Sequence, residues 1–178
     1  ASSLNVSSFN TSKVTTMSEM FRWCYLLQYV DVSGFDTGNV TDFSYMFLDC
    51  WALDNLDVSK FNTTKAGNMA FMFSDCRSLS SLDLSHFDTS SLTNIQGMFS
   101  GCEKLDTVDL SSWKPTQVTD IRYMFYYCTN LTTVYVGPKW NLSSVTDNGT
   151  DVFTNCINIV GGKGLADRKS GSAGMPRP

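Results

Sequence analysis

The chain has 178 residues, of which 42% are hydrophobic, enough apolar material for one domain with a sizeable core. The formal net charge is -4 and charged residues make up 17%, so the chain lacks the basic surface that binds nucleic acid or anionic lipid. No run approaches the roughly 18 apolar residues of a membrane span, and the opening residues, ASSLNVSSFN, lack the basic and apolar regions of a secretion signal. We therefore expect no nucleic-acid partner, no membrane insertion, and any secretion signal to lie outside these residues.

The cysteines mark an internal repeat. Five of them follow one another at one constant interval, Cys24, Cys50, Cys76, Cys102 and Cys128, and Cys156 follows after a slightly longer one. A common frame surrounds them, visible as LDVSKFNTTKAGNMAFMFSDCRSL from Leu56. A fixed period between about 20 and 50 residues is typical of solenoids and determines the architecture before any local propensity does.

The first element of each unit is illustrated by residues 43–50. Their apolar side chains are spaced i, i+3, i+4 and i+7, which is one face of about two helical turns; they are Phe43, Met46, Phe47 and Cys50. Thr41 stands where a helix N-cap belongs, and Asp42 follows where the helix dipole favours an acid. The spacing predicts a short helix here and in the equivalent part of every unit.

The second element follows the cysteine. The spacing Cys-x-x-Leu-x-x-Leu-x-Val of Cys50, Leu53, Leu56 and Val58 is the skeleton of a leucine-rich repeat with Cys in the first leucine place. Because Leu56 and Val58 are two residues apart, both point inward from a predicted short strand, while Asp57 between them points out.

One unit has inward apolar side chains and no partner face of its own, so it buries them only by stacking on its neighbours. We therefore predict an α/β solenoid, a leucine-rich-repeat-like stack of about six 26-residue units. Short parallel strands form one face and short helices or 3₁₀ turns the other. At roughly 4.8 Å per strand the stack is on the order of 30 Å long.

Both ends depart from the frame. The last unit, residues 134–160, has Tyr135 in place of the usual acid and Gly137 and Pro138 at the strand end, which is typical of a C-terminal capping repeat. No cap precedes Leu4, and we expect self-association through this open N-terminal edge. Residues 1–163 form the predicted solenoid, and residues 164–178, rich in Gly, Pro, Ser and charge, are predicted to be a disordered linker or tail.

The frame Met-Phe-x-x-Cys-x-x-Leu-x-x-Leu-Asp-Leu-Ser resembles the BspA-like leucine-rich repeats of bacterial surface proteins over roughly residues 4–163. The commoner unit of that family is shorter and carries Ala-Phe-x-x-Cys, so the chain is similar to the longer branch with Phe-Asp-Thr-Ser-x-Val-Thr-x-Met. The resemblance implies a secreted protein, anchored to the cell wall or membrane and described as an adhesin, with no catalytic residues to carry over.

The cysteines could suggest disulfides or a metal site. Equivalent side chains in a solenoid run parallel rather than toward each other, which disfavours disulfide geometry. Zinc ligands typically include pairs much closer in sequence than these cysteines. We therefore predict buried free thiols that pack as small hydrophobic groups, with no metal and no cofactor.

Acidic residues recur at one outward strand position, at Asp31, Asp57, Asp83 and Asp109, with Asn5 and Tyr135 ending the row. Unit charges about 4.8 Å apart repel by roughly 0.9 kcal/mol even in water. The row therefore needs support from Ser or Thr hydroxyls, backbone donors, solvent or a cation. It is either a solvated, hydrogen-bonded face or a docking strip for a basic or cation-bridged ligand.

Exposed aromatic residues are a further indication of a partner, since Trp and Tyr anchor binding surfaces at low entropic cost. One group, toward the N-terminus, comprises Trp23, Tyr25, Tyr29 and Trp51, and a second comprises Tyr123, Tyr126, Tyr127 and Tyr135. Alternatively, Tyr45, Phe71 and Tyr123, which share one repeat position, cover the helix side of the core. The single histidine, His86, lies at a variable loop position and is predicted to be an ordinary surface residue.

An enzyme is the weakest hypothesis, because the sequence has no nucleophile elbow, no Gly-rich phosphate loop and no metal-ligand cluster. We predict a non-catalytic, extracellular module of the cell surface or cell wall, an adhesin that binds a host or matrix protein or a glycan. The expected contact residues are Tyr29, Asp31, Trp51, Asp57, Asp83, Asp109 and Tyr135. The alternative is a structural spacer within a longer surface protein.

Overall fold

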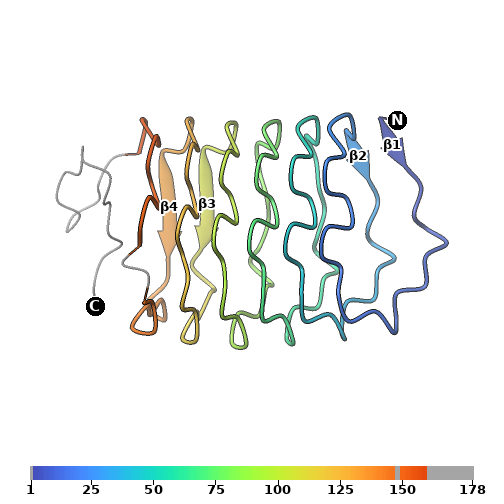
Figure 1. Cartoon of the computed structure of the whole chain (residues 1–178), viewed down its shortest axis with the longest axis horizontal. Coiled ribbons are helices and arrows are strands. Elements are labelled where there is room, and N and C mark those ends of the chain that lie inside the picture. The colour runs from blue at the N-terminus through green and yellow to red at the C-terminus, as the bar shows by residue number, and fades with distance from the viewer. Residues whose placement is uncertain (1, 147–148, 160–178) are drawn as a thin grey trace.

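The computed structural model describes residues 2–146 and 149–159. The backbone winds through successive coils that lie side by side from the N-terminal to the C-terminal end (Figure 1). Four strands lie at corresponding places in their coils: β1 (Ser3–Leu4), β2 (Tyr29–Val30), β3 (Thr107–Leu110) and β4 (Thr133–Val136). We call these strands, with the equivalent segments 55–58 and 81–84, the strand face.

The strands pair in parallel, β1 with β2 and β3 with β4, and each pair joins two successive coils. Ser3 of β1 lies opposite Tyr29 of β2, and Thr107 of β3 lies opposite Thr133 of β4. Partners are therefore separated by one repeat, which confirms the period read from the cysteines. The strand predicted around Leu56 and Val58 is wrong, because among the described residues neither 55–58 nor 81–84 forms a strand.

The predicted short helices or 3₁₀ turns are not found either: the described ranges contain no helix of either kind. Residues 43–50 instead form consecutive turns, closed by bonds from the Met46 amide to the Phe43 carbonyl (3.3 Å) and from the Cys50 amide to the Phe47 carbonyl (3.2 Å). Every fourth residue has a positive φ, 59° at Tyr45 and 61° at Asp49. The same turns recur in the other coils and form what we call the turn face.

The turns replace a helix because their backbone amides are used between coils. The amides of Phe43, Tyr45, Phe47 and Asp49 each donate at 2.9 Å to a carbonyl in the next coil. A helix would direct those amides along its own axis to carbonyls four residues back. The turns still bury the apolar residues at i, i+3, i+4 and i+7, so helical spacing alone does not distinguish the two structures.

Thr41 likewise does not cap a helix. Its amide and its hydroxyl both donate to the carbonyl of Thr15 in the preceding coil, at 2.9 and 3.2 Å. Asp42 forms an isolated parallel bridge with Thr16 on one side and Asn68 on the other. The residues expected to begin a helix therefore join neighbouring coils.

The core consists largely of stacked columns. One aromatic column contains a Phe from each coil, with ring centroids 5.2–6.0 Å apart and planes within 13° of parallel: Phe21, Phe47, Phe73, Phe99, Phe125 and Phe153. Such offset stacks add to the stabilisation that comes from burial itself. Since each inner ring contacts the equivalent ring in both neighbouring coils, one residue type repeated at one position supports the whole stack.

The cysteines are free thiols and five of them are buried, as predicted; Cys24 is half-buried. The thiol of Cys50 donates to the Phe21 carbonyl at 3.1 Å, and that of Cys76 to the Phe47 carbonyl at 3.3 Å. Each sulfur is thus directed at a carbonyl of the preceding coil. Burial raises the pKa of Cys50 to about 12, so this thiol stays protonated at neutral pH.

Threonines of the Phe-Asp-Thr motif form a polar column inside the stack. The Thr37 side chain is 1% exposed. Its hydroxyl donates to the Asn62 carbonyl at 3.1 Å and accepts the Asn62 amide at 2.7 Å. Thr11 makes the same pair of bonds with Asp36. The threonine of the motif therefore satisfies two backbone groups of the next coil.

Several predictions about the ends stay predictions. The solenoid assignment for residues 1–163 and the capping role of residues 134–160 are untested, and so is self-association through the N-terminal edge. Residues 164–178 lie outside the described residues. Within the described part, no helix is long and apolar enough to span a membrane.

Candidate functional site

The acidic row lies on the strand face, where all four of its carboxylates are exposed. We call Asp31, Asp57, Asp83 and Asp109 the carboxylate ladder. Each accepts, through Oδ1, the backbone amide of the serine two residues later at 2.8–3.0 Å; these serines are Ser33, Ser59, Ser85 and Ser111. Asn5 makes the same turn with the amide of Ser7 at 3.0 Å. The Asp-x-Ser spacing therefore has a local structural role.

The serine contacts also affect ionisation. The backbone amide of the following serine is the main cause that lowers the pKa of Asp57 and Asp83 below its ordinary value. A side-chain hydrogen bond from the serine is the main cause of the lowered pKa of Asp31 and Asp109. Because hydrogen bonds to the charged form favour that form, all four carboxylates are ionised at neutral pH.

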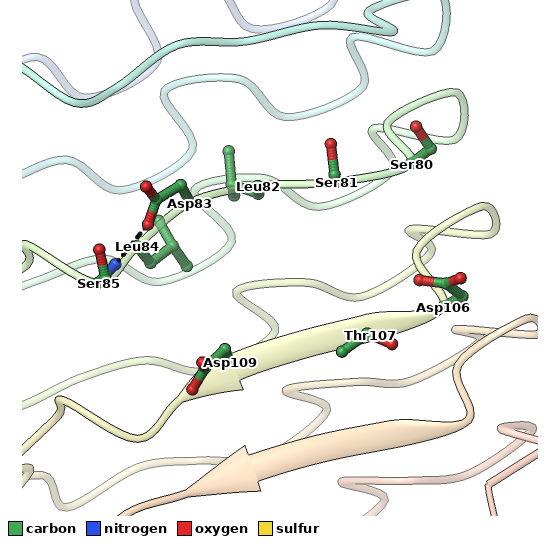
Figure 2. A pocket seen from close by; sticks show the side chains of 9 residues that line it. All are labelled: Ser80, Ser81, Leu82, Asp83, Leu84, Ser85, Asp106, Thr107 and Asp109. Carbon is green, nitrogen blue, oxygen red and sulfur yellow. Dashed lines mark hydrogen bonds between the residues drawn. The ribbon is translucent and has the colours of Figure 1, made fainter.

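A shallow hollow of about 340 Å³ opens between two coils of the strand face (Figure 2). Segment 80–85 forms one side, and Asp106, Thr107 and Asp109 form the other. Two members of the carboxylate ladder, Asp83 and Asp109, thus border one site, and serine hydroxyls line it with them. The sequence prediction missed Asp106, which belongs to the loop before β3 rather than to the repeated strand position.

The predicted aromatic contact residues are exposed but do not form one patch. Tyr29 on β2 is 52% exposed, and Tyr135 on β4 is 55% exposed and lies opposite Asp109 in the strand pairing. Trp51, 40% exposed, lies in the loop between the turn face and the strand face. The site residues predicted from sequence therefore cover the length of the strand face and one adjoining loop.

Trp51 belongs to a continuous column of side chains that crosses four coils at the position after the cysteine. Its ring packs on Tyr25 with centroids 4.5 Å apart, and the Arg77 guanidinium lies 4.6 Å from its centroid. Arg77 in turn approaches Glu103 at 3.7 Å. The Trp51 indole Nε1 also donates to Asp49 at 2.8 Å. We call Tyr25, Trp51, Arg77 and Glu103 the loop column.

The sequence prediction included Tyr25 and Trp51 but missed Arg77 and Glu103. Their shared repeat position was the signal that could have found them, because equivalent positions of neighbouring coils touch. The column fixes the orientation of Trp51 from both sides, which lowers the entropy that a partner would have to remove on binding it.

The second predicted aromatic group divides. Tyr126 makes T-shaped contacts with Tyr123 (5.6 Å) and Tyr127 (4.6 Å) on the turn face. Tyr135 lies on the strand face instead. On the turn face Tyr45 and Phe71 stack at 5.3 Å, consistent with the alternative in which this repeat position covers the core.

His86 is more than an ordinary surface residue. Its Nε2 lies 2.8 Å from the carbonyl of Val58, in the preceding coil of the strand face. In the next coil the indole of Trp113 donates to the equivalent carbonyl, that of Leu84, at 3.2 Å. Both side chains satisfy carbonyls in segments that form no strand.

The exposed groups are of kinds that take part in binding. Carboxylates, hydroxyls and aromatic rings are present, and residues 2–146 and 149–159 contain no group of three or more His, Cys, Asp or Glu side chains that could hold a metal ion. The surface can accept hydrogen bonds, attract cations and contact apolar groups.

Comparisons with known proteins agree with this fold. A family model described as "Mycoplasma protein of unknown function, DUF285" matches residues 1–83 and 55–161. No curated protein matches the sequence. A solved structure of a leucine rich cell surface protein from Faecalibacterium prausnitzii A2-165 is similar, with a TM-score of 0.53 and 22% identity over 90% of this chain and 42% of that one.

A leucine-rich repeat protein from Bacteroides ovatus ATCC 8483 has a TM-score of 0.47 and 20% identity, over 79% of this chain and 39% of that one. The chain thus spans about two-fifths of the length of either solved protein. The similarity to the Faecalibacterium protein shows a leucine-rich-repeat fold, which confirms the predicted solenoid class. The narrower BspA-like motif stays a prediction.

Proposed function

Because the chain belongs to the DUF285 family and folds as a leucine-rich-repeat solenoid, we propose that it is a non-catalytic module of the cell surface that binds a host or matrix protein or a glycan. The Faecalibacterium protein of the same fold is described as a leucine rich cell surface protein. That description supports an extracellular place for this chain, at the cell surface or cell wall.

The observation that carries the proposal is the division between inward and outward residues. The repeated Phe, Met, Leu, Cys and Thr side chains are mostly buried and joined to neighbouring coils. Outward positions vary from coil to coil, and several carry large rings that the stack does not need, among them Tyr29, Trp51 and Tyr135. A regular scaffold with irregular exposed aromatic residues is typical of binding surfaces in repeat proteins.

Binding would be tested with the full chain against immobilised matrix proteins and mucin-type glycans. Tyr29→Ala with Trp51→Ala tests the aromatic residues, and Asp57→Asn with Asp83→Asn tests the carboxylate ladder. Tyr127→Ala is the matched control, because this ring is similarly exposed (47%) but lies on the turn face. We expect saturable binding that one of the two pairs weakens at least about ten-fold, the loss of one hot-spot contact.

A structural spacer is the second candidate. It is favoured by the serine contacts, which give every carboxylate of the ladder a role in its own turn. If the folded chain binds none of the probes, the spacer becomes the better account. If Tyr127→Ala weakens binding as much as the strand-face variants do, the binding does not belong to the strand face.

A further inference from the structure

Strand pairing on the strand face is interrupted in the middle of the stack. Among the described residues, β1 pairs with β2 and β3 pairs with β4. Within the same ranges, no pairing joins β2 to segment 55–58, segment 55–58 to segment 81–84, or segment 81–84 to β3. The strand arrows accordingly occur only toward the two ends of the stack (Figure 1).

The interruption coincides with the carboxylate ladder. Where pairing exists, the ladder position meets or adjoins an uncharged residue: Asp109 lies opposite Tyr135, and the pairing of β1 with β2 ends at Leu4 and Val30, one residue before Asn5 and Asp31. Where pairing is absent, an aspartate follows an aspartate, as Asp31, Asp57, Asp83 and Asp109 succeed one another from coil to coil. Among the described residues, none of the three junctions between like charges contains a strand pair, whereas both coil junctions with an uncharged partner contain one.

We propose that repulsion within the carboxylate ladder holds the middle of the strand face open, and that this face closes into a continuous parallel sheet when the charges are screened or neutralised. The inference concerns the conformation of the chain and does not depend on the proposed binding function. The repulsion is the reason why segments 55–58 and 81–84, whose sequences NLDV and SLDL resemble that of β3, form no strand.

The magnitudes permit this. In a closed sheet the carboxylates of neighbouring coils stand about 4.8 Å apart. At that distance the repulsion of two unit charges in water shifts an equilibrium by about four-fold per pair. The net contribution of one strand hydrogen bond is of similar size, so at each junction the repulsion offsets about one hydrogen bond of a short pairing such as that of β1 with β2.

Other charged groups near the ladder act unevenly on it. After the serine contacts, Lys60 and His86 favour the charged form of Asp57, and His86 favours that of Asp83, so both partly offset the repulsion there. Asp106 adds a further carboxylate at the hollow between Asp83 and Asp109. Repulsion by a ladder neighbour acts on the two end members: the Asp57 carboxylate repels that of Asp31, and the Asp83 carboxylate repels that of Asp109.

The opening is local because the coils stay joined at the start of the turn face. Isolated parallel bridges connect successive coils there, in the series Thr16, Asp42, Asn68, Asn94 and Asp120. On the open face, His86 and Trp113 satisfy the carbonyls of Val58 and Leu84. The stack therefore stays intact while the hollow between segment 80–85 and β3 is open (Figure 2).

Amide-resolved hydrogen exchange on the full chain, by NMR at neutral pH and low salt, tests the proposal. The test variant is Asp57→Asn with Asp83→Asn, which removes every like-charged junction. Asparagine preserves the turn, as Asn5 shows. The matched control is Asp36→Asn with Asp88→Asn: these carboxylates accept the same kind of amide contact, from Gly38 and Ser90, and the net charge changes equally, but Asn62 separates them in their column.

We expect protection factors in segments 55–58 and 81–84 to rise about ten-fold or more in the test variant and to stay unchanged in the control. Raising the salt to about 1 M, where the Debye length is about 3 Å, should raise them in the wild type but not in the test variant. The proposal is overturned if the test variant keeps wild-type protection, if the control gains as much, or if wild-type residues 81–84 are already as protected as β3.

Discussion

Replacing Thr37 by valine tests the polar column inside the stack. Valine has nearly the shape of threonine but lacks the hydroxyl that bonds both the carbonyl and the amide of Asn62. Each buried backbone group left without a partner costs about 1–3 kcal/mol. Asn62 itself is exposed, so water reaches part of this site. We therefore expect Thr37→Val to lower the free energy of unfolding by about 2 kcal/mol.

The assay is urea unfolding followed by circular dichroism, with the m-value checked for constancy across the variants. Thr37→Ser keeps the hydroxyl and removes one methyl group, so it should cost about 0.8 kcal/mol. Thr64→Val is the surface control, because Thr64 is exposed and its hydroxyl donates to the exposed Asn62 side chain at 2.8 Å rather than to a backbone group of the next coil. The reasoning is refuted if Thr37→Val is as stable as the wild type, or if Thr37→Ser is less stable than Thr37→Val.

Three further results are expected. Gly97→Ala should destabilise the chain by about 2 kcal/mol or more, because Gly97 has a φ of +59° and an added Cβ would overlap the Phe71 ring. Gly34→Ala is the control: an added Cβ there meets nothing within 4 Å, so the free energy of unfolding in urea should change by less than about 0.5 kcal/mol. Burial raises the pKa of the Cys50 thiol to about 12, so the stability that this thiol contributes is complete below its unfolded pKa and is lost as the pH rises toward 12. The urea midpoint should therefore fall more steeply above about pH 9 for the wild type than for Cys50→Ala, and equal slopes would contradict this. If the strand edge at β1 associates, light scattering should show a fraction of dimer that rises with protein concentration. A strict monomer at high concentration would contradict self-association through this edge.

The sequence by itself determined which residues face inward and how often the pattern repeats. Evenly spaced cysteines can share one position only in stacked coils, so the buried thiols, the parallel register and the outward aspartates all follow from spacing. The Asp-x-Ser turn also depends only on neighbouring residues, since the contact from Asp57 to the Ser59 amide spans two positions. Local and periodic features of this kind leave a signal in a single sequence because every coil repeats them.

The tertiary structure alone decided what each backbone group bonds to. Phe43, Met46, Phe47 and Cys50 have helical spacing, yet alternate amides of this segment, among them those of Phe43 and Phe47, donate to the next coil, and turns allow this where a helix would not. The same applies to the open middle of the strand face, where the outcome depends on which charge stands in the adjacent coil. Segment 81–84 and β3 have similar sequences, SLDL and TVDL, but Asp83 lies between two aspartates whereas Asp109 has Tyr135 on one side. Contacts between residues one repeat apart, rather than local propensity, therefore determine both differences.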